Sequence, residues 1–443
     1  MRKIERRAVL CLLMAGVLLA GVFVFVTRFA ASGAQWATFY GNQGLYQNGK
    51  MPHCSVYDRD GTLLMQSDDT GITYIDDYDT RLATVQVVGD ADGNIATSVL
   101  SAFQDKLVGY NLVTGTYTLT GETSLKLTID ADISRVAYEA LAGRDGFVCV
   151  YNYETGDILC AVSTPTFDPM DPPELTEDDQ SGIYINKVFS ATQTPGSTFK
   201  LLTAAAAIEN VPGIEDWSYY CVGTRDVYGE KITCTYAHGQ VDFDRALAVS
   251  CNCGFSQMSE MIGPGVFQDY VDKTGLTKSY TIDDNIHTEP GTFEFPSDAD
   301  LNLGWAGIGQ WNDQVNPCAM MVYMGAIASG DGKAASPRIL QATLPVVKHT
   351  DQMILSETAA RLQAMMKNDV LTTYGEENYP GLDLYAKSGT AEVYGKEPHA
   401  WFTGFIKNPD HPYAFVVCVE NGGFGSEVAG PVANAVLQEA VKP

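Results

Sequence analysis

The residues best suited to covalent chemistry lie in segment 194–200, which reads Thr-Pro-Gly-Ser-Thr-Phe-Lys. Pro-Gly predicts a turn, and Ser197 then begins a helix that is apolar on nearly all sides and should therefore be buried. Ser197 and Lys200 share one face of that helix. A serine hydroxyl is a weak nucleophile until a base takes its proton. Because a buried lysine loses its charge more easily, Lys200 can act as that base.

A serine and a lysine at this spacing are common by chance, so further motifs must decide whether the pair is catalytic. Segment 250–252 reads Ser-Cys-Asn and follows an amphipathic stretch, 241–249. Segment 387–390 reads Lys-Ser-Gly-Thr and opens an expected strand. An S-x-x-K, an S-x-N and a K-[ST]-G motif in this order are typical of penicillin-binding proteins and class A β-lactamases.

The elements that must position these motifs follow an α+β pattern. Apolar spacing predicts a helix over 131–141, and a second helix, 429–441, ends the sequence. Strand-like runs separated by turn residues predict a hairpin early in this region and three strands late in it. These strands are 147–151, 158–162, 387–394, 400–406 and 413–419. Five antiparallel strands with helical material between them predict one layered domain, 126–443.

The residues before this domain predict an anchor and a small connecting region. Residues 1–7 are a basic tail, and 8–27 carry no charge, so a helix there would span roughly 30 Å, the thickness of a bilayer core. We expect a single transmembrane anchor with the tail in the cytoplasm and the rest outside. A cleaved signal peptide is the alternative, although its apolar core is usually shorter. Residues 28–50 read as a juxtamembrane linker, and 51–125 as a small β-rich linker domain.

Composition excludes some functions. The chain has 443 residues and a formal net charge of −26, which argues against nucleic acid as a partner. The six histidines form no HExxH motif and no spaced pair of metal ligands. A Ser-His-Asp triad is not excluded by residue order, but no G-x-S-x-G motif occurs. Trp401, Phe402 and Phe405 alternate on an expected strand and read as core.

The ten cysteines leave several possibilities open. Cys11 lies in the expected span. Cys221 and Cys234 flank a turn and could form a disulfide. Cys251 and Cys253 lie near His238 in sequence, but their spacing fits no zinc-ligand pattern. The sequence therefore predicts no metal site, and unpaired thiols are the simplest interpretation.

Taken together, the motifs resemble those of class B penicillin-binding proteins, the monofunctional peptidoglycan transpeptidases. The resemblance covers roughly residues 51–443, is strong over the transpeptidase domain and is thin before it. The N-terminal part is short beside the pedestal of many members. The matching segments are 195–200 (PGSTFK), 58–61 (DRDG), 127–130 (LTID), 309–310 with 316–317, and 400–405 (AWFTGF).

The resemblance implies the family fold, a five-stranded antiparallel sheet with helices on both faces, and it implies a role for each motif residue. Ser197 would attack the penultimate D-Ala carbonyl of a stem peptide and expel the last D-Ala, with Lys200 as the base. Ser250 would pass a proton to the leaving amine, supported by Lys387. Asn252 would hold the substrate amide and orient Lys200.

The resemblance also implies how substrate is held. Ser388, Gly389 and Thr390 would form the substrate-binding strand, and the backbone N–H groups of Ser197 and Thr390 would form the oxyanion hole. No cofactor is expected. The expected partners are peptidoglycan stem peptides, covalently bound β-lactams and a glycan polymerase.

Three other functions are compatible with part of this motif pattern. A β-lactamase needs a base that activates water for hydrolysis of the acyl-enzyme. The segment most similar to the one that carries this base in class A β-lactamases is 298–302 (Asp-Ala-Asp-Leu-Asn), with Asp298 in the position of the base. A penicillin sensor would need several membrane spans. A catalytically silent scaffold would tend to lose the motif residues, which are intact here.

Overall fold

The structure is a computed structural model that describes most of the chain. The described residues are 2–38, 53–68, 70–108, 110–111, 115–116, 123–176, 181–227, 229–296, 301–342 and 346–442. Two expectations fall partly outside this range. They are the linker residues 39–50 and the first part of the segment 298–302.

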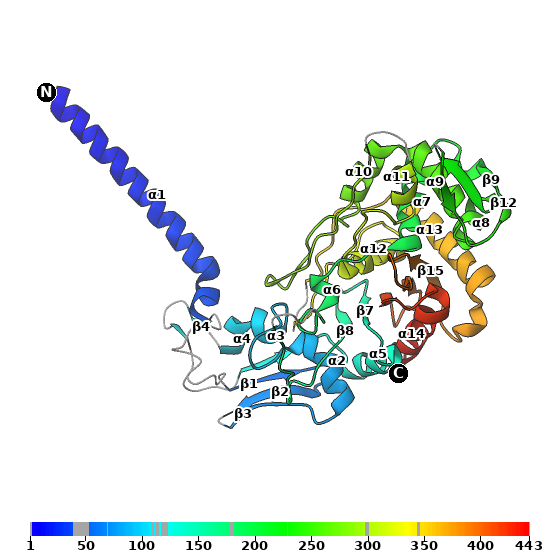
Figure 1. Cartoon of the computed structure of the whole chain (residues 1–443). Coiled ribbons are helices and arrows are strands. Elements are labelled where there is room, and N and C mark those ends of the chain that lie inside the picture. Colours follow the sequence, from blue (N-terminus) through cyan, green and yellow to red (C-terminus); the bar gives the residue numbers. More distant parts are fainter. Residues whose placement is uncertain are drawn as a thin grey trace.

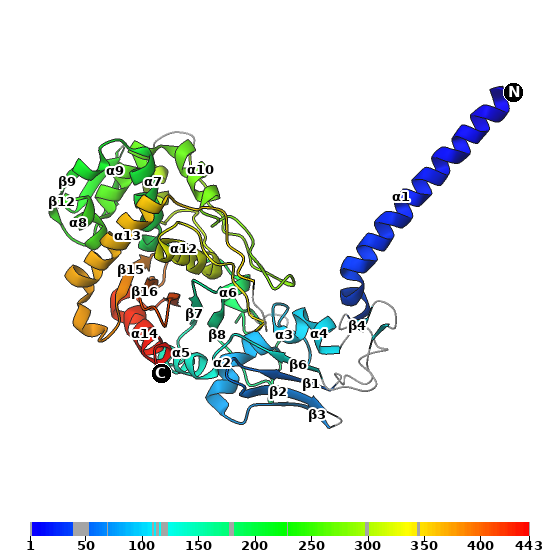
Figure 2. The same cartoon turned by 180° about the vertical axis from the view of Figure 1, so that it is seen from behind.

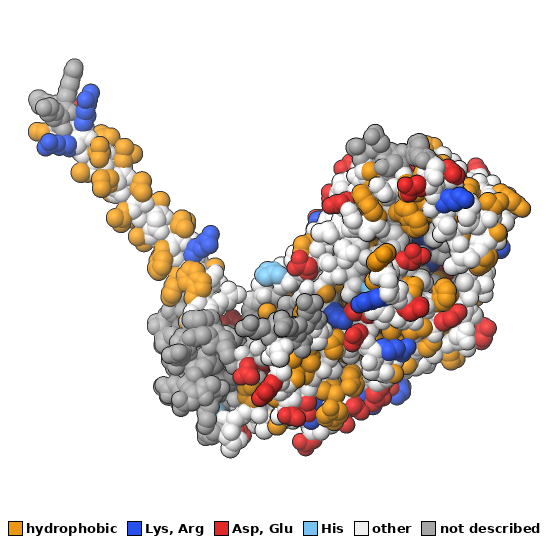
Figure 3. All heavy atoms as spheres, viewed as in Figure 1, with side chains coloured by type: hydrophobic (Ala, Val, Ile, Leu, Met, Phe, Trp, Pro, Cys, Tyr) orange, Lys and Arg blue, Asp and Glu red, His pale blue; other side chains and the backbone are white. Residues whose placement is uncertain are grey.

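The N-terminal helix α1 (Arg2–Thr38) stands apart from the rest of the molecule (Figures 1 and 2). Within the described residues it is the one helix long and apolar enough to cross a membrane, and its most apolar stretch is not buried. Figure 3 shows apolar side chains along this helix, with basic side chains near both ends. The helix continues past the apolar run to Thr38, because residues 28–38 contain no proline to break it.

A small mixed sheet follows. Its strand order is β3-β2-β1-β6, and β1 and β6 are parallel. The strands are β1 (Cys54–Tyr57), β2 (Leu63–Asp68), β3 (Gly71–Tyr74) and β6 (Thr123–Lys126). The expectation of a β-rich region is incomplete, because helices α2 (Tyr78–Val88), α3 (Val99–Ala102) and α4 (Gln104–Val108) also occur here.

Helix α2 was missed because Thr80, Thr84 and three valines favour strands. Tertiary packing overrides that preference. The Asp77 side chain caps the helix by accepting from Thr80 N–H, and the helix then packs on α5 (Ala131–Leu141) and β8.

The central sheet is five-stranded and antiparallel, which confirms the predicted fold. Its order is β15-β16-β17-β7-β8. The strands are β7 (Gly146–Asn152), β8 (Ile158–Thr164), β15 (Leu384–Ala391), β16 (His399–Ile406) and β17 (Tyr413–Val419). Helices α5 and α14 (Gly425–Ala440) cover one face, and α12 (Pro317–Ser329) packs on the other (Figure 1).

Both faces of the sheet are therefore buried. Trp401 and Phe405 belong to the core under α12, while Phe402 belongs to the core under α14. This confirms that these aromatic side chains form core and alternate along the strand. Strand β15 begins at Leu384, three residues before the predicted start, so Lys387 lies inside the strand.

The remaining elements form a mainly helical lobe against the sheet (Figure 1). Its helices include α6 (Lys187–Ser190), α7 (Lys200–Asn210), α8 (Phe243–Ala248), α9 (Asn252–Ile262), α10 (Pro264–Lys273), α11 (Leu301–Ala306) and α13 (Ser356–Asp369). Short strands cross its surface as pairs: β9 (Ser218–Cys221) with β12 (Gly239–Asp242), β10 (Thr224–Val227) with β11 (Glu230–Thr233), and β13 (Thr281–Ile282) with β14 (Ile286–His287). Two-residue strands β4 (Tyr110–Asn111) and β5 (Gly115–Thr116) pair near α1.

Candidate active site

Ser197 lies on a 3₁₀ turn, η2 (Gly196–Phe199), that leads into α7. Gly196 has φ +55°, and a Cβ there would meet Thr390 O at 2.8 Å, so only glycine lets this turn pack against β15. The Gly196 N–H also donates to Gly309 O at 2.8 Å. The sequence predicted one continuous helix from Ser197. The 3₁₀ geometry instead places residues three apart directly above one another, which brings Lys200 over Ser197.

Lys200 is fully buried and lies at the centre of the site. Its Nζ donates to Ser197 Oγ at 2.9 Å and to Ser250 Oγ at 3.0 Å. It also donates to Ser250 O at 2.8 Å and to Asn252 Oδ1 at 2.6 Å. The structure therefore brings two of the predicted motifs together around one amine.

Burial, together with the nearby charge of Lys387, lowers the pKa of Lys200 to about 7. The Phe255 ring, 5.7 Å from Nζ, forms part of this environment. An amine with this pKa is substantially neutral at neutral pH. Since it already contacts Ser197 Oγ, it can accept the hydroxyl proton.

Ser250 has φ +53°, a left-handed conformation that is strained for serine. Its Oγ lies 3.0 Å from Lys200 Nζ and 3.3 Å from Lys387 Nζ, so it bridges the two lysines. Asn252 begins α9, and its Nδ2 donates to Thr233 O at 2.8 Å. An amide has two donors, so Asn252 can still donate to a substrate.

Lys387 is also fully buried, on β15, and donates to Ser388 O at 2.8 Å. Burial lowers its pKa to about 8, and the Asp369 carboxylate opposes that shift. Asp369 ends α13, is completely buried, and neither carboxylate oxygen has a hydrogen-bond partner among the described residues. Burial raises the pKa of Asp369 well above its usual range, and the nearby charge of Lys387 opposes that rise. The two groups therefore interact through charge and not through a hydrogen bond. Sequence reasoning missed Asp369, because it belongs to no motif.

Most of the predicted site residues line a cleft of about 720 Å³. Ser197, Ser250, Asn252, Ser388 and Thr390 all line it, while Lys387 lies behind its surface. Gly389 is also absent from the wall. It packs against η2, where a Cβ would meet Thr198 Cγ2 at 2.8 Å.

Several residues of the cleft were missed from the sequence. The Tyr374 hydroxyl accepts the Ser388 N–H at 2.8 Å and donates to Ser388 Oγ at 3.1 Å. It comes from a π-helical turn, η4 (Val370–Tyr374), a rare feature that is frequent at functional sites. Tyr236, Trp305 and Phe424 add aromatic side chains to the walls.

The sequence left open a serine–histidine pair and a disulfide. The side-chain partner recorded for Ser197 Oγ is Lys200, and no described histidine hydrogen-bonds to it. Cys221 and Cys234 are free thiols whose sulfurs lie 3.8 Å apart, so the possible disulfide is not formed.

Comparison with known proteins identifies the class to which this fold and site belong. Residues 146–438 match the penicillin-binding protein transpeptidase domain. The chain therefore belongs to the penicillin-binding protein transpeptidase family, which confirms the resemblance seen in the sequence.

Two relatives illustrate the range of the family. Stage V sporulation protein D of Bacillus subtilis (strain 168) is 27% identical over 350 residues, which cover 72% of this chain and 53% of the relative. The peptidoglycan D,D-transpeptidase PbpA of Mycolicibacterium smegmatis is 26% identical over 358 residues, 71% of this chain and 72% of the relative. The chain thus spans about half of the first relative and nearly three quarters of the second.

Solved structures share the fold. The ceftriaxone acyl-enzyme of penicillin-binding protein A from M. tuberculosis superposes with a TM-score of 0.77 at 22% identity, covering 90% of this chain and all of that one. Pseudomonas aeruginosa PBP2 gives a TM-score of 0.72 at 22% identity, covering 87% of this chain and 95% of that one.

Proposed function

We propose that this chain is a membrane-anchored peptidoglycan D,D-transpeptidase that acts through a Ser197 acyl-enzyme and binds β-lactams covalently. The observation that carries this proposal is the environment of Lys200, a buried amine with a lowered pKa in contact with Ser197, Ser250 and Asn252. Relatives named peptidoglycan D,D-transpeptidases and solved β-lactam acyl-enzymes of this fold support the same chemistry.

In the acylation step, Lys200 takes the Ser197 proton as Oγ attacks the penultimate D-Ala carbonyl carbon. The backbone N–H groups of Ser197 and Thr390 stabilise the oxyanion, a kind of contact worth about 3 kcal/mol per donor. Ser250, which bridges the two lysines, delivers its proton to the leaving D-Ala amine and takes up the proton that Lys200 received from Ser197, so Lys200 becomes neutral again. The C–N bond breaks, and the stem peptide remains as an ester on Ser197.

In the second step, an acceptor amine from another strand attacks the ester. Lys200, again neutral, removes the amine proton, and Ser197 Oγ leaves with a proton as the cross-link forms. Thr390 and Ser388 lie where they can hold the terminal carboxylate of the donor peptide, with the positive charge of Lys387 behind them. Asn252 orients Lys200 and offers its second N–H to the substrate amide.

The setting of the enzyme is part of the proposal. Helix α1 anchors the chain, the basic residues at its start stay in the cytoplasm, and the catalytic domain lies outside. The acceptor strands come from a separate glycan polymerase. Analysis of the cross-links formed on polymerised lipid II, with and without a candidate polymerase, tests this dependence.

The test of the nucleophile is covalent labelling with a fluorescent β-lactam. We expect the full chain in detergent to label and Ser197→Ala to lose the label. Ser190→Ala, an exposed serine at the end of α6, serves as the matched control and should label normally. Undiminished labelling of Ser197→Ala would overturn the assignment. Rapid turnover of the label would favour a β-lactamase, and no labelling of the parent chain would favour a silent scaffold.

A further inference from the structure

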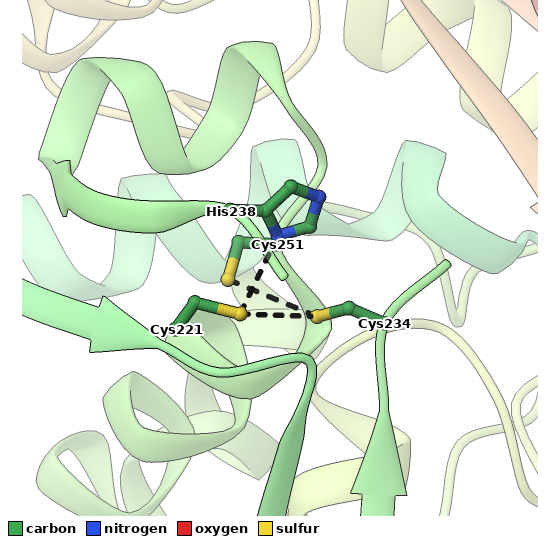
Figure 4. A group of neighbouring side chains, drawn as sticks. All are labelled: Cys221, Cys234, His238 and Cys251. Atoms are coloured by element: carbon green, nitrogen blue, oxygen red, sulfur yellow. Dashed lines mark hydrogen bonds between the residues drawn. The ribbon is translucent and has the colours of Figure 1, made fainter. Parts of the chain in front are cut away.

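Four side chains from separate turns lie together beside the cleft, and we name them the thiol–imidazole cluster: Cys221, Cys234, His238 and Cys251. They come from the end of β9, the turn after β11, the turn before β12 and the N-cap of α9. One ligand atom from each lies within 4.8 Å of all the others. Figure 4 shows the four side chains converging on one shared space. Three are buried, and Cys234 is half-buried.

The separations match a tetrahedral metal site. Cys234 Sγ lies 3.8 Å from Cys221 Sγ and 3.9 Å from Cys251 Sγ. His238 Nδ1 lies 3.5 Å from Cys221 Sγ. Around a tetrahedral Zn²⁺ with ordinary bond lengths, two sulfurs lie about 3.8 Å apart, and a sulfur and a nitrogen lie about 3.6 Å apart. A disulfide would instead need about 2 Å.

The backbone supplies a second, independent observation. Each of the three sulfurs accepts a backbone N–H, and such donors stabilise the thiolate that a metal requires. The donors are Gly223, Cys253 and Gly254, each 3.4 Å from the sulfur of Cys221, Cys234 and Cys251 respectively.

A fourth thiol, Cys253, lies outside this arrangement. Its Sγ is 3.5 Å from Cys234 Sγ but does not belong to the group of mutually close ligand atoms. It donates instead to Ile232 O at 3.6 Å. Cys253 therefore contributes its backbone N–H to the cluster and not its sulfur.

We propose that the thiol–imidazole cluster binds one zinc ion through three cysteine sulfurs and one histidine nitrogen. Binding forms three Zn–S bonds and one Zn–N bond, and the three thiol protons pass to solvent. Thiolate and imidazole donors favour zinc over magnesium or calcium. Four protein ligands complete the tetrahedron, so the ion has no open position for substrate and its role is structural.

The position of the cluster gives the ion a consequence for catalysis, which rests on the proposed function. Cys251 lies between Ser250 and Asn252. Cys234 directly follows Thr233, whose carbonyl accepts from Asn252 Nδ2. The ion would therefore tie the β9–β12 turns to the start of α9 and hold Ser250 in its strained conformation.

The first experiment measures metal content in the full chain purified in detergent under reducing conditions with zinc supplied. We expect one zinc per chain by elemental analysis. Replacement by Co²⁺ should give the intense visible and near-ultraviolet bands of a tetrahedral thiolate site. A chain without zinc, or a Cys221–Cys234 disulfide found under these conditions by mass spectrometry, would overturn the proposal.

Variants then identify the ligands. Cys221→Ser and His238→Ala should lose the zinc, whereas Cys253→Ala and the distant Cys160→Ala should keep it. His238→Cys converts the set to four thiolates, so it should keep the metal and strengthen the sulfur-to-cobalt bands. This last variant guards against simple misfolding. Zinc retained unchanged in both Cys221→Ser and His238→Ala would show adventitious binding elsewhere and refute the site.

The catalytic consequence is tested separately on the unmutated protein. Removing zinc with a chelator should slow β-lactam acylation by about 100-fold, the effect of displacing catalytic groups by about 1 Å, and adding zinc back should restore it. An unchanged rate in the zinc-free protein would refute the positioning role. Zinc binding without any labelling of the parent chain would refute the proposed function and leave the metal site standing.

Discussion

The cleft has a helix side and a strand side, and each presents one fully buried lysine. Lys200 on α7 contacts neutral oxygen atoms, and burial together with the nearby charge of Lys387 brings its pKa to about 7. Lys387 on β15 is equally buried, but Asp369 supports its charge and its pKa falls only to about 8. The difference supports the proposed roles, in which the helix lysine is the base and the strand lysine is the cation. Two like groups whose environments separate their pKa values mark an acid–base pair.

The largest expected effect comes from removing the base. Lys200→Ala should lower the rate of β-lactam acylation by about 10³-fold, because Ser197 then has no proton acceptor in contact. Stopped-flow labelling measures this rate. Lys367→Ala, which removes a lysine on the exposed side of α13, provides the control. If both variants acylate at the normal rate, Lys200 is not the base that takes the Ser197 proton.

The acylation rate should depend on the protonation of both lysines and should therefore vary with pH. Acylation requires neutral Lys200, so its rate should fall by about tenfold for each pH unit below about 7. It also requires charged Lys387, so the rate should fall again above about pH 8. The second-order acylation rate against pH should therefore be bell-shaped. A rate that keeps rising to pH 10 would show that Lys387 need not carry charge.

Asp369→Asn should sharpen the same comparison. Without the carboxylate, the pKa of Lys387 falls further, so the alkaline limb of the profile should move to lower pH. The maximal rate should fall by about tenfold, because less charged Lys387 remains when Lys200 is neutral. The acid limb should move to higher pH, because a Lys387 that has lost its charge no longer lowers the pKa of Lys200. An unchanged alkaline limb would show that Asp369 does not affect the pKa of Lys387.

The smallest effect is expected at Tyr374, which holds Ser388 through two hydrogen bonds. Tyr374→Phe removes both hydrogen bonds and should reduce acylation about fivefold, a loss of about 1 kcal/mol, mainly through weaker binding. Measuring the acylation rate against β-lactam concentration tests this, because it separates the concentration needed for half-saturation from the maximal rate. Tyr379→Phe, which keeps a ring stacked on Phe402, is the control. If Tyr374→Phe lowers only the maximal rate and leaves half-saturation unchanged, the result would contradict a binding role for Ser388.

The sequence predicted the catalytic motifs because each is local. Ser197 and Lys200 share one turn, and the Ser-Cys-Asn and Lys-Ser-Gly-Thr segments are short, so residue type and order suffice to find them. The central strands were equally clear, since their apolar runs end at turn residues. The start of β15 was predicted three residues late, because Leu384 and Tyr385 join the strand through pairing with Ile406 and Phe405.

Other features were beyond the reach of sequence patterns. Helix α2 is rich in β-branched residues and exists because α5 and β8 offer it a surface. Asp369 ends α13 and Tyr374 ends the π-helical turn η4, and no local sequence signal indicates that either residue interacts with β15. The cysteines and His238 match no zinc spacing, because their donors are brought together from four separate turns.

The sequence by itself therefore predicted the proposed nucleophile and its proposed base, the order of the motifs and the apolar N-terminal helix, since these depend on neighbours along the chain. Only the tertiary structure decided which lysine carries charge and which thiols meet. The physical reason is that desolvation and electrostatic interaction depend on distance in space. Burial of both lysines, the nearness of Asp369 to one of them, and the convergence of four turns beside Ser250 exist only in the folded chain.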